Sequence, residues 1–349
     1  MILRGEARCK ADNEIVAECL ASFLKEKQMS LPSLLEGNLR LPLIGAPMFI
    51  VSGPELVIEQ CKAGIVGSFP ALNARPQEAL VDWIRQIKEE TAAHAEANPG
   101  EQVAPFAVNQ IAHPSNPRLM ADMEVCVKEE VPIVITSLNP PAEIVQAVHS
   151  YGGLVFHDII NIRHARKAIG QGVDGVIAVC TGAGGHAGPL SPFALIGEIR
   201  KEYDGCLILS GCISRGDDVL AATAMGADLA YSGTRFIASA EARAVPDYKE
   251  MIVESAAADV VYSSLFTGIH GNYLGGSIRN AGMDPQNLPE GSKHDMDFKK
   301  ASESDSKAWK DIWGAGQGVG NIDDVLPARE IVLRMEQEYR AALARVGAA

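Results

Sequence analysis

The chain has 349 residues, with 31 Lys and Arg against 44 Asp and Glu, a formal net charge of −13 and 47% hydrophobic residues. This negative balance argues against nucleic acid or an anionic membrane surface as a partner, because both would be repelled. The apolar content suffices for a large buried core. Because no apolar run reaches the roughly 18 residues of a transmembrane helix and no secretory signal is visible at the N-terminus, we expect a soluble, cytoplasmic protein.

The cysteines support the same location. They are scattered and form no C-x-x-C pair, which is typical of reduced thiols in a cytoplasmic protein and not of a disulfide framework or a zinc site. We therefore expect no metal. The positions are Cys9, Cys19, Cys61, Cys126, Cys180, Cys206 and Cys212.

Residues 1–35 form an N-terminal extension to which we assign no function; Asp12-Asn13 is a candidate cap for a short amphipathic helix. From Leu41 onward, short apolar runs alternate with helix-length amphipathic segments. The expected strands are Leu41–Met48, Gly64–Phe69, Val103–Ile111, Val131–Leu138, Gly153–Ile159, Gly175–Cys180, Cys206–Gly211 and Leu229–Phe236. The expected helices are Pro76–Glu90, Pro117–Glu129, Ala142–Ser150, Ile162–Gln171, Pro192–Lys201 and Arg215–Gly226.

Near-continuous apolar strands separated by helices indicate parallel pairing with both faces covered. Eight such units over residues 36–240 predict an α/β fold, a closed (β/α)8 TIM barrel. The alternative is an open doubly wound sheet. The barrel is favoured because nothing in the series marks a reversal of strand order.

After the eighth unit the pattern changes. Residues 241–320 combine helical stretches with loops dense in Gly, Asn, Ser and Pro, and predict a smaller, mostly helical subdomain over the barrel mouth. Residues 321–349 predict a C-terminal helix, Val325–Val346, that returns to the barrel. The charged section 293–311 is most simply a solvated face.

Small and polar residues mark the strand ends, where barrels place their active sites. The sixth strand runs into Gly182–Gly188, four glycines around His186. Glycine permits close backbone approach to a flat or anionic ligand, and the imidazole can move a proton near neutral pH. The seventh and eighth strands end in Ser210-Gly211-Cys212-Ile213 and Ser232-Gly233-Thr234-Arg235, small-residue turns at the position where barrels commonly bind phosphate.

A phosphate site beside a glycine-lined face suggests a flat, phosphorylated cofactor. No Walker A pattern is present, and no G-x-G-x-x-G follows the first strand. FMN therefore fits better than ATP or a tightly held dinucleotide.

With these residues in view, the chain resembles the nitronate monooxygenase family, formerly called 2-nitropropane dioxygenases, from about Leu41 to the C-terminus. The resemblance depends on the strand-end motifs in their order and spacing. They are Gly45-Ala46-Pro47-Met48, Asn109, Ala183–Gly188, Ser210–Ile213, Gly233–Phe236 and Gly316-Gln317-Gly318.

The resemblance implies an FMN-binding barrel and an active-site role for His186. The implied flavin contacts are Ala46, Pro47, Met48 and Asn109, and the implied phosphate contacts are Gly184, Gly185, Gly211, Gly233 and Thr234. We add Asp158 and Gln317 as expected cofactor contacts. Asp158 is a departure, because many relatives carry a basic residue at the end of the fifth strand; a carboxylate there would alter flavin electronics or substrate charge preference.

The implied function is FMN-dependent oxidation of alkyl nitronates, and of nitroalkanes as further candidates, by O2 to a carbonyl compound and nitrite. In it His186 is the candidate base. The alternative enzyme is an NAD(P)H-dependent flavin reductase of quinones or enoyl thioesters, and the non-catalytic alternative is a flavin-storing or partner-binding barrel. Small molecules are the expected partners, and a homodimer is a candidate assembly.

Structural roles compete with these assignments. His186 alone could be a donor in a turn, Asn109 could satisfy buried backbone, and Asp158 could cap the next helix. His164 has the pattern of a surface residue and Trp313 that of a packing residue. His270 and Tyr273 are candidates for the barrel mouth.

Overall fold

The computed structural model describes residues 31–139, 142–291 and 311–347. The candidate helix after Asp12-Asn13 and most of the charged section 293–311 lie outside the described residues.

Eight parallel strands form the barrel. Their spatial order is β1-β9-β8-β6-β5-β4-β3-β2, and a parallel bridge between Ile44 and Val66 brings the two ends of the sheet together. The Gly45 N–H donates to the Val66 carbonyl at 2.8 Å across this seam. The predicted TIM barrel is therefore confirmed. The strands are β1 (Leu43–Gly45), β2 (Gly67–Pro70), β3 (Phe106–Ala112), β4 (Ile133–Leu138), β5 (Leu154–Ile159), β6 (Gly175–Val179), β8 (Cys206–Ser210) and β9 (Leu229–Ser232).

Helices follow the strands around the outside, as the parallel pairing requires. One of these helices, α2, was not predicted from the sequence. It has Pro54 in its first turn and buries Leu56 and Val57. The outer helices are α2 (Pro54–Lys62), α3 (Ala79–Ala97), α4 (Leu119–Lys128), α5 (Ala142–His149), α6 (Ile162–Ile169), α7 (Pro192–Arg200) and α8 (Gly216–Met225).

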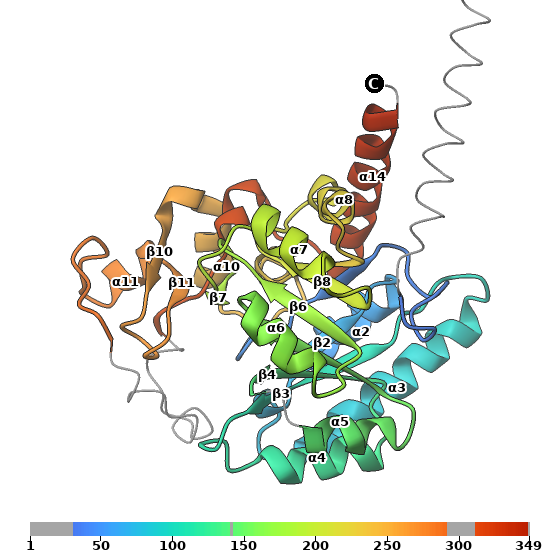
Figure 1. Cartoon of the computed structure of the whole chain (residues 1–349). Helices are drawn as coiled ribbons and strands as arrows, with labels where there is room; N and C mark the ends of the chain where they lie inside the picture. Colours follow the sequence, from blue (N-terminus) through green and yellow to red (C-terminus); the bar gives the residue numbers. More distant parts are fainter. Residues whose placement is uncertain (1–30, 140–141, 292–310, 348–349) are drawn as a thin grey trace, which may run out of the picture.

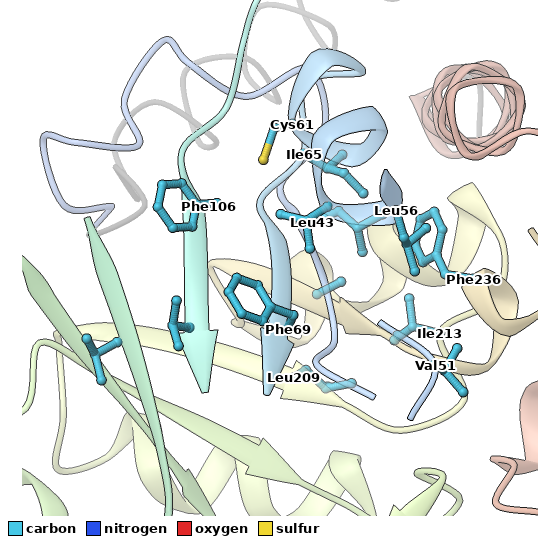
Figure 2. Packing of buried hydrophobic residues seen from close by; sticks show 14 of the residues in the cluster. Leu43, Val51, Leu56, Cys61, Ile65, Phe69, Phe106, Leu209, Ile213 and Phe236 are labelled. Atoms are coloured by element: carbon cyan, nitrogen blue, oxygen red, sulfur yellow. The ribbon is translucent and has the colours of Figure 1, made fainter. Parts of the chain in front are cut away.

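Alternate strand residues face two apolar layers. Leu43, Val108 and Leu209 belong to the outer layer, which packs against the helices, and Figure 2 shows part of it around α2. Their chain neighbours Ile44 and Ala107 belong to the inner layer, which fills the barrel. Because both faces of each strand are covered, the strands read as continuous apolar runs and not as alternating ones.

The eighth strand is shorter than the sequence suggested. The prediction ran to Phe236, but β9 ends at Ser232 and the short helix α9 (Thr234–Ile237) follows. Gly233 starts the turn, and its carbonyl accepts from the Phe236 N–H at 2.8 Å. The apolar residues after Gly233 are helical and buried, which a run of hydrophobicity alone does not distinguish from a strand.

The segment after α9 adds helices and a small sheet at one side of the barrel (Figure 1). The helices are α10 (Pro246–Glu254) and α11 (Gly275–Asn280), and the antiparallel strands are β10 (Val260–Ser263) and β11 (Gly271–Leu274). The third strand of this sheet is β7 (Gly185–His186), from the glycine loop. This β-structure was not predicted within the mostly helical subdomain.

The last helix, α14 (Ala328–Gly347), lies beside α8 on the barrel wall (Figure 1). Its buried positions include Ile331, Val332 and Met335, and Glu336 makes an ion pair with Arg40 at 3.0 Å. In the described part of the chain, no helix combines the length and apolar character needed to cross a membrane.

Candidate active site

A cavity of about 810 Å³ lies at the carboxyl ends of the barrel strands. It has the size typical of small-molecule sites, roughly 300–1,000 Å³. Almost all of the expected site residues line it, although they come from segments far apart in the sequence. These are Ala46, Pro47, Met48, Asn109, Asp158, Gly184, Gly185, His186, Gly211, Gly233 and Thr234.

Gln317 is the exception. Its neighbours Gly316 and Gly318 line the cavity, but Gln317 is not among the described lining residues and its side chain is exposed. Gln317 contacts the glycine loop through its backbone, whose N–H donates to the Gly182 carbonyl at 2.9 Å.

The glycine loop is held from the appended sheet. Gly185 and His186 pair with Asn272 and Gly271 of β11. The buried Asn272 amide donates to the Ala183 carbonyl at 2.6 Å. The loop that follows β6 is therefore fixed by residues nearly 90 positions further along the chain.

His186 is oriented by Thr267. The two side chains are joined by a hydrogen bond of 2.8 Å between Nε2 and Oγ1. Thr267 can donate its single hydroxyl proton to the Ile269 carbonyl at 3.0 Å; when it does, Nε2 must be the donor toward Thr267, and Nδ1 carries the imidazole lone pair. Burial lowers the pKa of His186 from 6.5 to about 4, so the ring is neutral near pH 7.

Gly184 and Gly316 allow two segments far apart in the sequence to meet next to Thr234. The Gly316 N–H donates to Thr234 Oγ1 at 2.9 Å. A Cβ at Gly184 would lie 2.8 Å from the Gly316 nitrogen, so a side chain there would push these two segments apart. Gly211, in the turn after β8, has φ +144°, a conformation open to glycine and unfavourable for other residues.

A chain of hydrogen bonds crosses the ends of β3, β4 and β5. Asn109 donates its side-chain amide to Ser137 Oγ at 2.9 Å, and Ser137 donates to Asp158 Oδ2 at 2.6 Å. Asp158 Oδ1 is buried and has no hydrogen-bond partner within the described residues. Burial raises the pKa of Asp158 from 3.8 to about 6, and the hydrogen bond from Ser137 opposes part of that rise.

The structure decides several of the competing structural roles. Asp158 does not cap the following helix, because the side chain that accepts from the first turn of α6 is Asn161. His164 and Trp313, expected at the surface or in packing, both line the cavity, and Trp313 also stacks on Tyr248 with ring centroids 5.0 Å apart.

The two candidates for the barrel mouth, His270 and Tyr273, occupy different positions. His270 lines the cavity, whereas Tyr273 is fully buried. Ser137, which ends the fourth predicted strand, lines the cavity as a strand-end residue should. Ile50, Leu138, Tyr231 and Tyr262 also line it and were not singled out from the sequence. Leu138 could have been found, because it ends the same predicted strand; the others had no distinguishing signal.

The cavity is lined by glycines, lies at the carboxyl ends of the barrel strands and has a neutral imidazole in its wall. Barrel enzymes bind small molecules at this position. A sequence model of one family, described as nitronate monooxygenase, matches residues 37–338. The chain belongs to the nitronate monooxygenase family and is an oxidoreductase.

Individual relatives are distant. A nitronate monooxygenase from Paraburkholderia phytofirmans is 27% identical over an alignment that covers 86% of this chain and 93% of that protein. The solved nitroalkane oxidase of Streptomyces ansochromogenes superposes with a TM-score of 0.74 at 23% identity, covering 90% of this chain and 100% of the other. FabK from Thermotoga maritima gives 0.70 at 24% identity, with 90% and 96% covered. At such identities the two structures establish a shared fold alone.

Proposed function

We propose that the protein is an FMN-dependent nitronate monooxygenase that oxidises alkyl nitronates with O2 to a carbonyl compound and nitrite. The observation that carries this proposal is the setting of His186. In a chain of this family, a neutral imidazole lines a cavity whose other walls are the glycine turns expected to receive a flavin phosphate.

The cavity residues fit the phosphate end of FMN. Thr234 Oγ1 already accepts from the Gly316 N–H, so its own hydroxyl proton is available to an anionic oxygen. The backbone at Gly184, Gly211 and Gly233 lines the cavity without side chains, and backbone N–H groups of such turns suit phosphate. We assign the phosphate to these residues.

The polar strand ends fit the ring of a flavin. The side-chain amide of Asn109 donates to the Ile135 carbonyl and to Ser137 Oγ. Its Oδ1 accepts no hydrogen bond within the described residues. This oxygen can therefore accept from an N–H of the flavin ring. Ala46, Pro47 and Met48 supply a small, largely apolar wall for a flat ring. When bound, FMN would supply the redox chemistry, accepting electrons from the substrate and passing them to O2.

His186 has two separate roles in this proposal. It lines the cavity where the substrate binds, and it is the candidate base for substrates that arrive as neutral nitroalkanes. With a pKa of about 4, its driving force for removing a carbon-bound proton is weak, because general bases work best when their pKa lies near the operating pH. Pre-formed nitronates, which need no deprotonation, are therefore the preferred substrates.

The test begins with the purified protein, loaded with FMN. Oxidised-flavin absorbance would establish the cofactor, and oxygen uptake with nitrite release on addition of butyl-1-nitronate would establish the reaction. Bound flavin without turnover of any nitronate would contradict the proposal. Size-exclusion chromatography of the same sample would test the expected homodimer.

The alternative, an NAD(P)H-dependent flavin reductase, is kept because the cavity is near the upper end of the usual size range and FabK shares the fold. Such an enzyme must dock a second nucleotide. Against it, none of the described lining residues is a Lys or Arg able to hold nucleotide phosphates. Anaerobic mixing with NADH and with NADPH separates the two functions, since rapid bleaching of the flavin by either would favour the reductase.

A further inference from the structure

The turn that joins β1 to α2 forms one wall of the cavity. Met48, Phe49, Ile50 and Val51 all line the cavity, and we call residues 48–52 the wall turn. Inside it, the N–H groups of Val51 and Ser52 donate to the Met48 carbonyl at 3.2 and 3.0 Å. The wall turn is therefore a compact loop whose shape decides the shape of that side of the cavity.

Ile50, in the middle of the wall turn, has an unfavourable backbone conformation. Its φ is +58°, a left-handed value that is an outlier for a β-branched residue. For a residue other than glycine, such a conformation costs roughly a factor of 5–30 in population. Burial does not compensate for this cost, because the Ile50 side chain is 40% exposed. Other contacts must hold the turn, and strain of this kind gathers at ligand sites.

The side chain of Asn73 supplies these contacts. Its Oδ1 accepts from the Ile50 N–H at 2.9 Å. Its amide donates to the carbonyls of Met48 and Ser52, both at 2.9 Å. One side chain thus uses its oxygen and its nitrogen on three backbone groups of the wall turn, at the start, at the strained centre and at the end.

The segment that carries Asn73 is itself fixed from α4. It is the short helix η1 (Ala71–Asn73), which follows β2. Arg118 donates to the carbonyls of Ala71 and Ala74 at 3.2 and 2.9 Å. Arg118 also donates to the buried Asp122 at 3.1 Å. Because the backbone is bonded on both sides of Asn73, its side chain projects from a fixed position.

Arg75 makes a second contact between this segment and the wall turn. Its guanidinium carbon lies 5.5 Å from the centre of the Phe49 ring, a distance at which a cation and an aromatic face attract each other. Its Nε donates to the Leu72 carbonyl at 3.1 Å. Leu72 lines the cavity as well, so residues 71–75 both support the wall turn and extend the same wall.

We propose that Asn73 is a positioning residue, which holds the wall turn in the shape to which the cofactor binds. Asn73 is not among the described residues that line the cavity, so it acts through the backbone of the turn. Its hold on the turn does not depend on a cofactor, whereas its effect on FMN binding rests on the proposed function.

The first experiment measures the wall turn in the cofactor-free protein by hydrogen exchange and mass spectrometry. In Asn73→Ala, exchange of the Ile50 amide is expected to be at least about tenfold faster, because this N–H loses its acceptor and the turn relaxes. The matched control is Asn98→Ala. Asn98 is also half-buried and donates to a backbone carbonyl, that of His94 at 2.9 Å, at the end of α3. Exchange at Ile50 that is no faster in Asn73→Ala than in the parent would overturn the inference.

The second experiment measures FMN affinity by fluorescence titration of the apoproteins, well below the unfolding midpoint of every variant. Asn73→Ala is expected to weaken FMN binding by about tenfold, which is within the cost of the left-handed conformation. Asn98→Ala should leave the affinity unchanged. A purely structural role for Asn73 predicts a lower midpoint of thermal unfolding in both variants and the parent's affinity in both, and that result would overturn the inference.

The third experiment repeats the titration in an Ile50→Gly background, where the strain is removed because glycine adopts positive φ freely. There Asn73→Ala is expected to weaken FMN binding by only about threefold or less, since the turn no longer has to be held against its own preference. Equal losses in the two backgrounds would overturn the inference. If the parent itself does not bind FMN, the proposed function fails, and the exchange experiment still decides whether Asn73 holds the wall turn.

Discussion

At the scale of single residues, the cavity shifts two titratable groups toward their neutral forms. Burial lowers the pKa of His186 to about 4 and raises that of Asp158 to about 6. Both shifts follow from one cause, because desolvation penalises a cation and an anion alike. Near pH 7 the histidine is neutral, and the carboxyl group lies within about one unit of its pKa.

Replacement of the neutral His186 is expected to affect neutral nitroalkanes and pre-formed nitronates differently. His186→Asn is expected to lower kcat/KM for a neutral nitroalkane by ~10², the lower end of the usual contribution of a general base, because a pKa of about 4 leaves the imidazole a weak driving force. The activity on the corresponding pre-formed nitronate should stay within a few-fold, because that substrate has no proton to lose. Oxygen uptake with freshly prepared nitroethane and with ethyl nitronate measures both; an equal loss on both substrates would contradict the base role.

The raised pKa of Asp158 leads to a prediction on how the unfolding free energy depends on pH. Between pH 3.8 and about 6 the folded protein binds more protons at this residue than the unfolded chain, so its contribution to stability falls as the pH rises. Asp158→Asn should therefore stabilise the cofactor-free protein at pH 7 by on the order of 1–3 kcal/mol, with little effect near pH 4.

Urea unfolding at several pH values measures this difference. Glu89→Gln, which neutralises an exposed carboxylate on α3, is the control for the change in net charge. Unfolding free energies of the Asp158 variant and the parent that run parallel from pH 4 to 7 would show that Asp158 titrates as it does in the unfolded chain.

At the scale of elements, the contact between α8 and α14 depends on one glycine. A Cβ at Gly216 would overlap the Met335 carbonyl oxygen and lie 2.5 Å from the Tyr339 nitrogen. Gly216→Ala must separate two backbones and is expected to cost about 1–3 kcal/mol. Gly197→Ala, inside α7 with no atom near the new Cβ, should instead stabilise by about 0.5–1 kcal/mol. Thermal unfolding of both variants checks the opposite signs.

The barrel was predictable because each of its strands is buried on both faces. Val134, Val176 and Leu207 face the helices while their neighbours fill the barrel, so each strand is a continuous apolar run. The sheet formed by β7, β10 and β11 was not predictable in this way. Two residues, Gly185 and His186, make up β7, and no periodicity exists over two residues.

The site was predictable only where its residues belong to a local sequence pattern. The strand-end residues were found because each lies in the last part of a recognisable strand or directly after it. The pairing of Ser137 with Asp158 joins two strands through side chains, and the strain at Ile50 is set by a bond to Asn73. Neither contact has a signature in the local sequence, because both depend on which segments the fold brings together.

At the scale of the whole molecule, the barrel supplies the strand ends and the appended segment completes the cavity. Residues from both border it, including Asn109 of the barrel and Tyr262, His270 and Trp313 of the segment after α9. The buried Arg235 of α9 donates to the side chain and the carbonyl of Asp324, and so joins the end of the barrel to the chain that leads from the appended segment into α14. The order of the glycine loop should therefore depend on residues outside the barrel.

Asn272 tests this dependence. It is buried, it lies on β11, and its amide donates to the Ala183 carbonyl in the glycine loop. Asn272→Ala leaves that carbonyl without its partner and should lower the unfolding free energy by about 1–3 kcal/mol. If the cavity binds FMN as proposed, the same variant should weaken FMN binding by about tenfold or more, a loss of roughly 1.4 kcal/mol, because the glycine loop that lines the cavity loses its support. Asn287→Ala, an exposed asparagine of the same segment that bonds to Asp284, is the matched control. Fluorescence titration of FMN into the apoproteins measures the affinity, and an unchanged affinity in Asn272→Ala would mean that the barrel alone orders the loop.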